Sequence, residues 1–334
     1  MMSMEKLLTI LADGEFHSGD ALGLALGVTR AAIWKQLKKV SALGVELISV
    51  KGKGYRIDGG LDLLSEALVR AHLTEQTGAL LNNIELLAVV DSTNTVAMAK
   101  ALNKERGYVC SAEQQTAGRG RRGRSWASPF ASNIYLSVVW EFDAGAAALE
   151  GLSLALGVAV TEALAEVGVA QLQLKWPNDI IYRQQKLAGI LVEMTGDAAG
   201  PCSAVVGIGL NVTMPAAAAK DIGQPWTDLD SVLGSHVSRS QLLALLLNKV
   251  IPLLASFEQL GFSGYRQRWQ QLDSCAQQPV QMLLGDQRTT GVGQGVDASG
   301  AYQLLTERGL QCFSGGEVSL RVLGSQIEAV TAVD

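Results

Sequence analysis

GRGRRGRSW, residues 118–126, is the stretch on which the interpretation of this chain turns. Its three glycines have the G-x-G-x-x-G spacing of a dinucleotide-binding turn, which must leave an apolar strand and open a helix. Here polar residues come before the stretch, and Ser128 and Pro129 come soon after it, so no helix continues. The stretch therefore favours an arginine-rich loop over a doubly wound Rossmann domain.

The chemistry of this loop suits an anion. Each of its four guanidinium groups offers five N–H donors in a fixed fork that matches carboxylate or phosphate. The glycines allow the backbone N–H groups to approach a ligand closely. A basic loop can also be ordinary solvated surface, but such a loop has no need of a glycine at every second or third position. We therefore predict a mobile lid over an anion.

The composition is that of a soluble globular protein. The chain has 334 residues, of which 48% are hydrophobic and 18% charged, and this length predicts two or three domains. The sequence contains no run of 18 apolar residues, and its N-terminal segment is charged. We therefore expect a cytoplasmic protein with no membrane span. The cysteines and histidines are scattered, which predicts reduced core thiols and no metal site. These residues are Cys110, Cys202, Cys275, Cys312, His17, His72 and His236.

The net charge of −5 is unevenly distributed. Residues 1–60 contain eight Lys/Arg and six Asp/Glu, a balance of +2, and the remainder has a balance of −7. A local basic surface on an acidic protein indicates a module that contacts nucleic acid.

The order of elements in residues 1–60 predicts a winged helix-turn-helix DNA-binding domain. Ser18 can cap a helix that ends at Leu26, and Thr29 can cap a second helix after a short glycine turn. Two alternating segments then flank a basic tip, which predicts the wing. The residues expected to contact DNA are Thr29, Arg30, Ala31, Trp34, Lys35 and Gln36 in the recognition helix and Lys51 and Lys53 in the wing. A small helical bundle with solvated lysines is the alternative.

Residues 61–273 predict an α+β domain with a mixed sheet, because many strands accompany few long helices. The expected strands are 84–90, 108–112, 133–140, 172–176, 187–194 and 203–210, and the long helices are 149–167 and 240–261. We expect residues 274–334 to form a third domain. Their short strands at 280–284, 289–292, 302–305 and 318–322 predict a small SH3-like β-barrel.

The central domain contains neutral polar groups and cations but no evident nucleophile. Ser92, Thr93 and Asn94 follow a strand, where they can cap a helix or bind a polar ligand, and Gln115 ends another strand. Asn178, Asp179 and Asn211 could hold Mg²⁺ or a ribose. With Lys186 and the arginine loop, this set favours attack of a substrate carboxylate on an α-phosphate, driven by positioning and charge neutralisation.

At this level of detail the chain closely resembles the bifunctional biotin–protein ligases and biotin-operon repressors. The resemblance covers nearly the whole chain, and its motifs occur in the order of the family. They are Asp91-Ser92-Thr93-Asn94, Gly118–Arg124 with Trp126, Lys175-Trp176-Pro177-Asn178-Asp179, Lys186–Glu193 and Gly207–Asn211.

The resemblance implies a class II synthetase-like catalytic domain and a role for each matching residue. Lys186 and Arg121 are implied as catalytic. The implied biotin contacts are Ser92, Thr93, Asn94, Gln115, Gly118, Arg119, Gly120, Arg121, Lys186 and Gly189. The implied ATP and adenylate contacts are Arg121, Arg122, Arg124, Asn178, Asp179, Asn211 and Trp226. Trp226 is either the residue that packs near adenine or an ordinary loop hydrophobe.

The implied reaction joins biotin and ATP, with Mg²⁺, into biotinoyl-5′-AMP, and a lysine of the biotin carboxyl carrier protein then accepts the biotin. The adenylate-bound homodimer is expected to bind operator DNA and repress biotin-synthesis genes. Three alternatives stay open: a lipoate-type ligase, a ligand-sensing repressor without ligase activity, and a ligase whose DNA module no longer binds a specific operator.

Overall fold

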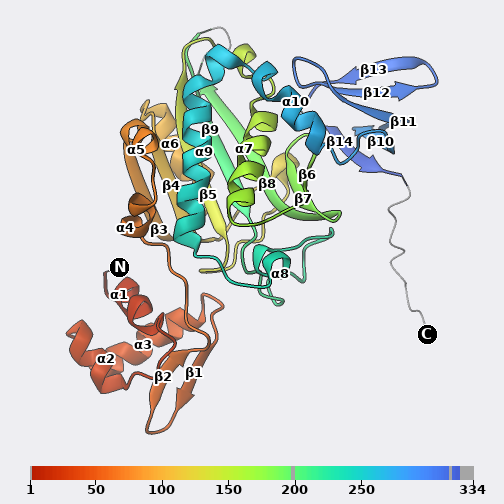
Figure 1. The fold of residues 1–334 in the computed structure, drawn as a ribbon. Coiled ribbons are helices and arrows are strands. Elements are labelled where there is room, and N and C mark those ends of the chain that lie inside the picture. Colours follow the sequence, from red (N-terminus) through yellow and green to blue (C-terminus); the bar gives the residue numbers. More distant parts are fainter. Residues whose placement is uncertain (1, 197–199, 316–317, 324–334) are drawn as a thin grey trace, which may run out of the picture.

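The computed structural model describes residues 2–196, 200–315 and 318–323, which form three parts (Figure 1). The N-terminal part has three helices and a two-stranded hairpin. Its elements are α1 (Met2–Leu11), α2 (Gly19–Leu26), α3 (Arg30–Ser41), β1 (Leu47–Val50) and β2 (Gly54–Ile57). The predicted winged helix-turn-helix is confirmed.

Local hydrogen bonds explain the boundaries of these elements. Ser18 Oγ accepts from Ala21 N at 3.0 Å and Thr29 Oγ1 accepts from Ala32 N at 3.3 Å, so both helices begin at the expected caps. The wing is joined to the helices by two backbone hydrogen bonds of 2.9 Å between His17 and Tyr55. A Cβ at Gly54 would lie 2.1 Å from the His17 carbonyl oxygen, so only glycine fits there.

The central part is a seven-stranded mixed sheet in the order β3-β4-β5-β9-β8-β7-β6. Only the β3–β4 pair is parallel, and the other neighbours are antiparallel. The strands are β3 (Asn83–Val90), β4 (Tyr108–Gln115), β5 (Ile134–Phe142), β6 (Leu172–Lys175), β7 (Asp179–Tyr182), β8 (Gln185–Gly196) and β9 (Cys202–Leu210). The mixed sheet predicted from the sequence is confirmed.

Helices cover both faces of this sheet. The helices are α4 (Glu66–Ala71), α5 (Glu75–Leu80), α6 (Thr93–Leu102), α7 (Leu152–Glu166), α8 (Leu229–Leu233), α9 (Arg239–Leu260) and α10 (Ser263–Leu272). Residues of α7 and α9 pack with Leu136 and Val138 of β5, whereas residues of α6 pack with Val139, which points to the opposite face. The sheet is therefore the middle of three layers, and α9 and α7 cross its front face in Figure 1.

Two helices, Ala146–Glu166 and Arg239–Leu260, are long and apolar enough to span a membrane by length and composition. In both, more than half of the apolar window is buried inside the protein, where α7 and α9 pack on each other and on the sheet. A helix that is apolar on all sides and covered by protein is a core helix.

The C-terminal part is a five-stranded antiparallel sheet in the order β13-β12-β11-β10-β14. Its strands are β10 (Pro279–Leu284), β11 (Gln287–Val296), β12 (Tyr302–Thr306), β13 (Gly309–Phe313) and β14 (Val318–Val322). The sequence prediction missed β13, because this strand is short and mostly exposed. The expectation of core thiols holds for three cysteines but was wrong for Cys312, which is exposed on β13. Residues 324–334 of the predicted domain lie outside the described residues.

Asp273, just after α10, carries a buried carboxyl at the junction of the central and C-terminal parts. It accepts hydrogen bonds from Cys275 N at 2.9 Å and Tyr302 Oη at 3.2 Å. Burial nevertheless raises the pKa of Asp273 to about 6, so the folded state holds a proton that the unfolded chain releases near pH 4. Stability therefore decreases as pH rises from about 4 to 6.

We expect Asp273→Asn to flatten this decrease and to make the protein more stable than the parent at pH 7.5, because the amide keeps an acceptor and removes the buried charge. Urea unfolding at pH 4.5, 6 and 7.5 measures the effect. Asp286→Asn, on an exposed turn, is the control and should follow the parent. An unchanged pH dependence in Asp273→Asn would contradict the assignment.

Candidate active site and DNA-binding surface

A cleft lies where the start of α6, the end of β4, strands β8 and β9 and the arginine loop meet. Its lining combines neutral polar side chains, cations and apolar residues. The lining residues are Ser92, Thr93, Asn94, Gln115, Arg119, Gly120, Arg121, Trp126, Tyr135, Leu136, Asn178, Lys186, Gly189, Ile190, Leu191, Gly207, Ile208 and Gly209.

Neutral hydrogen-bonding groups form one end of the cleft. Gln115 Oε1 accepts from Thr93 N at 2.9 Å and from Thr93 Oγ1 at 3.2 Å. Ser137 Oγ lies 2.8 Å from Thr93 Oγ1 and 2.6 Å from Asn94 Oδ1, and Asn94 Nδ2 donates to Glu193 Oε2 at 2.6 Å. Because Thr93, Asn94 and Ser137 are buried and all five side chains are bonded to one another, their donors and acceptors have fixed directions. Such a pocket suits an uncharged polar ring.

The arginine loop folds back on the sheet over this pocket. Two backbone hydrogen bonds close it: Trp126 N donates to Gly118 O at 2.8 Å, and Gly120 N donates to Arg124 O at 2.7 Å. The Trp126 ring lies directly on Gly209, where an added Cβ would come within 2.5 Å of it. A glycine at that point of β9 is what allows the loop to lie flat over the cleft.

Two cations meet at the other end of the cleft. Lys186 Nζ lies 2.7 Å from Asp179 Oδ1 and 5.2 Å from the centroid of the Trp126 ring. Arg121 Nη1 donates to Asn178 Oδ1 at 3.2 Å. Burial lowers the pKa of the Arg121 guanidinium, Asp179 opposes this effect, and Arg122 and Arg124 add to it by repulsion. A partly buried cation beside like charges gains stability when an anion binds.

The winged domain presents a basic surface made from α3 and the wing. Ile33, Leu37 and Val40 face its core, so the other side of α3 faces solvent. There Trp34 is 51% exposed and Lys38 Nζ lies 3.7 Å from its ring. The predicted contacts Thr29, Arg30, Ala31 and Lys35 are exposed, as are Lys51 and Lys53 at the wing tip, and Gln36 is half-buried.

Three family models match the chain in the order of its three parts. The HTH domain matches residues 4–56, the Biotin/lipoate A/B protein ligase family matches residues 86–211, and the Biotin protein ligase C terminal domain matches residues 278–321. The chain is 40% identical to the bifunctional ligase/repressor BirA of Salmonella typhimurium over 315 residues, which cover 94% of this chain and 96% of that protein. The chain belongs to the bifunctional biotin ligase/repressor family.

Other members and solved structures agree. BirA of Bacillus subtilis is 28% identical over 92% of this chain and 95% of its own length. The biotin protein ligase from Aquifex aeolicus in complex with biotin and ATP superposes with a TM-score of 0.62 at 30% identity, and covers 72% of this chain and 99% of its own.

In this ligase/repressor family member, most of the sequence-predicted site residues come together. Of the implied biotin contacts, all but Gly118 line the cleft, and Gly118 lies just outside it against Gln115 and Ser128. Of the implied ATP contacts, Arg121 and Asn178 line the cleft, and Asp179 reaches it through its ion pair with Lys186.

The remaining implied ATP contacts lie elsewhere. Arg122 and Arg124 line a second hollow with Arg288 and Arg321 of the C-terminal sheet. Asn211 Nδ2 donates to the carbonyl oxygens of Thr227 at 3.0 Å and Lys186 at 3.5 Å, so this amide holds a backbone segment in place. Trp226 directly precedes Thr227 in this segment, and the backbone of Trp226 pairs with that of Lys186.

Three residues had been given no role from the sequence: Trp126, which lines the cleft, and Ser137 and Glu193, which hydrogen-bond to side chains that line it. Ser137 orients Thr93 and Asn94, and Glu193 accepts from Asn94 and pairs with Arg119 at 3.4 Å. A serine within the apolar strand 134–142 needs a hydrogen-bond partner when it is buried, and this could have identified Ser137. The buried indole Nε1 of Trp126 has no hydrogen-bond acceptor among the residues that the structure describes, which is consistent with a ligand beside it.

Proposed function

We propose that this protein activates biotin with ATP to biotinoyl-5′-AMP and transfers the biotin to a lysine of the biotin carboxyl carrier protein. One observation carries the proposal: the neutral pocket of Thr93, Asn94 and Gln115 and the cations Lys186 and Arg121 line the same cleft. The neutral groups suit the uncharged ureido ring of biotin. The cations suit its carboxylate and the α-phosphate of ATP.

Both chemical steps are displacements that need positioning and charge neutralisation. A carboxylate oxygen of biotin attacks the α-phosphorus, the bond to the bridging oxygen breaks, and pyrophosphate leaves. The neutral amine of the carrier lysine then attacks the acyl carbon of the mixed anhydride, loses a proton, and AMP leaves. In this proposal Lys186, which lines the cleft, contacts the carboxylate and the phosphate together, lessens their repulsion before attack and stabilises the charge that develops during it.

Magnesium enters this scheme bound to the nucleotide. Mg²⁺ is commonly held by one or two carboxylates together with substrate phosphates. Among the described residues no cluster of three metal-binding side chains occurs, and Asp179, the carboxylate nearest the cleft cations, is paired with Lys186. Asp179 with Asn178 therefore fits an ion that arrives with the triphosphate and is held mainly by it.

Formation of the adenylate is the test of the enzymatic proposal. The purified protein is incubated with biotin and MgATP, and the bound product is identified by mass, with biotin-dependent ATP–pyrophosphate exchange as the second readout. Lipoate in place of biotin tests the lipoate-type ligase, and we expect no exchange with it. A protein that binds biotin but supports no exchange would instead be a repressor without ligase activity.

We further propose that the adenylate-bound protein is a cytoplasmic homodimer that binds operator DNA and represses biotin-synthesis genes. The exposed basic surface of α3 and the wing supports this proposal, because such modules place one helix in the major groove and bind two half-sites as dimers. Sedimentation with and without adenylate tests the dimer. A monomer at all ligand concentrations would contradict it.

Lys53→Ala should weaken DNA binding and lower the slope of log affinity against log salt by about one, because one phosphate contact is lost. Carrier biotinylation should be unchanged, since Lys53 lies on the exposed wing tip. Binding is measured by fluorescence anisotropy from 50 to 200 mM salt, with Lys6→Ala on the exposed side of α1 as the control. An unchanged salt slope in Lys53→Ala would remove the wing from the DNA interface.

A further inference from the structure

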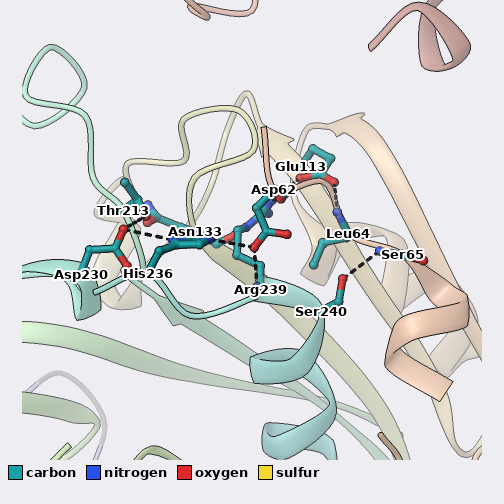
Figure 2. Close-up of polar contacts among 10 residues, drawn as sticks. All are labelled: Asp62, Leu64, Ser65, Glu113, Asn133, Thr213, Asp230, His236, Arg239 and Ser240. Atoms are coloured by element: carbon teal, nitrogen blue, oxygen red, sulfur yellow. Dashed lines mark hydrogen bonds and ion pairs between the residues drawn. The ribbon is translucent and has the colours of Figure 1, made fainter. Parts of the chain in front are cut away.

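The segment Leu61–Ser65 joins the winged domain to the central domain, and its residues alternate between the two. Leu61 and Leu63 pack on the core of the winged domain, whereas Leu64 packs on the core of the central domain. Asp62 lies between them and is held by Arg239, the first residue of α9 (Figure 2). Arg239 N donates to Asp62 Oδ2 and Arg239 Nη1 donates to Asp62 O, both at 2.6 Å.

Arg239 is a buried cation whose other donors are also used. Its side chain is 1% exposed; Nη1 also pairs with Glu113 Oε2 at 2.7 Å, and Nε and Nη2 donate to Asn133 O at 3.1 and 2.7 Å. The second oxygen of Glu113 accepts from Leu64 N at 2.6 Å. One buried ion pair therefore binds the linker backbone on both sides of Leu63. A guanidinium with this many partners cannot move without breaking several bonds at once.

Glu113 connects Arg239 to the neutral pocket formed by Thr93, Asn94 and Gln115. It lies on β4 two residues before Gln115, whose side chain binds Thr93. The backbone of Glu113 also accepts from Ala131 N at 2.9 Å, next to Phe130. Phe130 follows the arginine loop in the sequence, yet its side chain is buried in the core of the winged domain. The chain that leaves the arginine loop therefore contacts both Glu113 and the winged domain, so the position of the loop and the position of the winged domain depend on each other there.

Asn133 connects Arg239, through hydrogen bonds, to the side of the cleft on which Lys186 lies. Asn133 Oδ1 accepts from Val212 N at 2.8 Å, directly after Asn211. Asn211 in turn holds Thr227, in the segment that lies along Lys186. Asp62 has a second partner on this side, since His236 lies 3.1 Å from Asp62 Oδ2 and 3.2 Å from Asp230 Oδ2.

From this arrangement we propose that Arg239 is a positioning residue that couples the ligand cleft to the DNA-binding domain, with the Asp62 carboxylate as its contact on the linker. The inference rests on the proposed function. A ligand that immobilises Gln115 and the segment along Lys186 also immobilises Glu113 and Asn133, and so strengthens the hold of Arg239 on Asp62. Linkage requires the reverse as well: DNA that favours one placement of the winged domain must tighten adenylate binding by the same factor.

Asp62→Ala tests the coupling without breaking the buried Arg239–Glu113 pair. Hydrogen exchange of the linker amides 61–65 is measured by mass spectrometry with and without adenylate, formed in place from biotin and MgATP. In the parent we expect the adenylate to slow exchange by roughly tenfold, within the usual range of coupling between sites. In Asp62→Ala we expect this slowing to be lost while adenylate formation is unchanged.

Glu66→Ala is the matched control, because Glu66 lies just after the linker and pairs with exposed Arg70 on the same helix; it should respond like the parent. Asp62→Asn keeps an acceptor for Arg239 N and should retain more of the slowing than Asp62→Ala. DNA affinity is measured with and without adenylate, on duplexes that the adenylate-loaded parent has selected from a random pool. The ratio of the two affinities should be largest for the parent, smaller for Asp62→Asn and smallest for Asp62→Ala.

Two results would overturn the coupling: linker exchange in the parent that does not respond to a bound adenylate, or Asp62→Ala that responds in full. Failure of the proposed function is a separate result, because the parent would then show no adenylate by mass.

Discussion

Lys186→Met is expected to lower the rate of biotin-dependent ATP–pyrophosphate exchange by roughly 10²–10³-fold, the usual cost of removing one preorganised group that stabilises transition-state charge. Methionine keeps most of the length of the side chain and removes its charge. Because Lys186 pairs with Asp179, the substitution also leaves an unpaired carboxylate near the approaching phosphates, which adds repulsion.

The pattern of kinetic constants distinguishes this role from a structural one. We expect kcat for adenylate formation to fall more than the KM for biotin rises, because the neutral pocket that would bind the ring does not include Lys186. Lys249→Met removes a surface ion pair with Glu166 on the far layer of the fold and is the control. A Lys186→Met enzyme with the kcat of the parent would show that another cation performs the neutralisation.

Arg239→Met is expected to lower the free energy of unfolding by about 3–5 kcal/mol, because it leaves the Glu113 carboxylate buried without its cation. The methionine fills most of the space of the arginine stem, so the loss reports on charge and hydrogen bonds more than on packing. Urea unfolding followed by tryptophan fluorescence measures it.

Two further variants make this result interpretable. Arg268→Met breaks an exposed pair with Glu162 at 3.7 Å and should cost at most about 1 kcal/mol. Adding Glu113→Gln to Arg239→Met should recover part of the loss, because the buried charge disappears while an acceptor for Leu64 N remains. If the double variant were as unstable as the sum of two independent losses, the two side chains would not form the pair that the structure shows.

Much of the fold could be predicted because its determinants are local. The caps at Ser18 and Thr29 satisfy N–H groups three residues away, and the wing follows from alternation around a glycine tip. The strand-to-helix turn at Ser92 likewise follows from neighbours in the chain. The prediction missed β13, because this edge strand has only five residues and exposes apolar Leu310, so its alternation is too short to mark a buried face.

The arginine loop could be predicted only in part from the local sequence. Its composition predicted an anion site and excluded a Rossmann turn, and the structure shows no helix of a dinucleotide-binding motif there. Which arginine serves which site was not predictable. Arg122 has a φ of 60°, and this conformation separates Arg121, which lines the cleft, from Arg122 and Arg124, which line the hollow at the C-terminal sheet.

The sequence by itself determined the three-part organisation, the type of each domain and the kinds of side chain that line the cleft, because helix caps, strand alternation and motif spacing depend on residues a few positions apart. Only the tertiary structure decided that Ser137 orients Thr93 and that Arg239 joins Asp62 to Glu113. These partners are 44 to 177 residues apart. No local pattern records such contacts, because they form only when distant strands and helices pack into one core and a buried polar group must find its partner there.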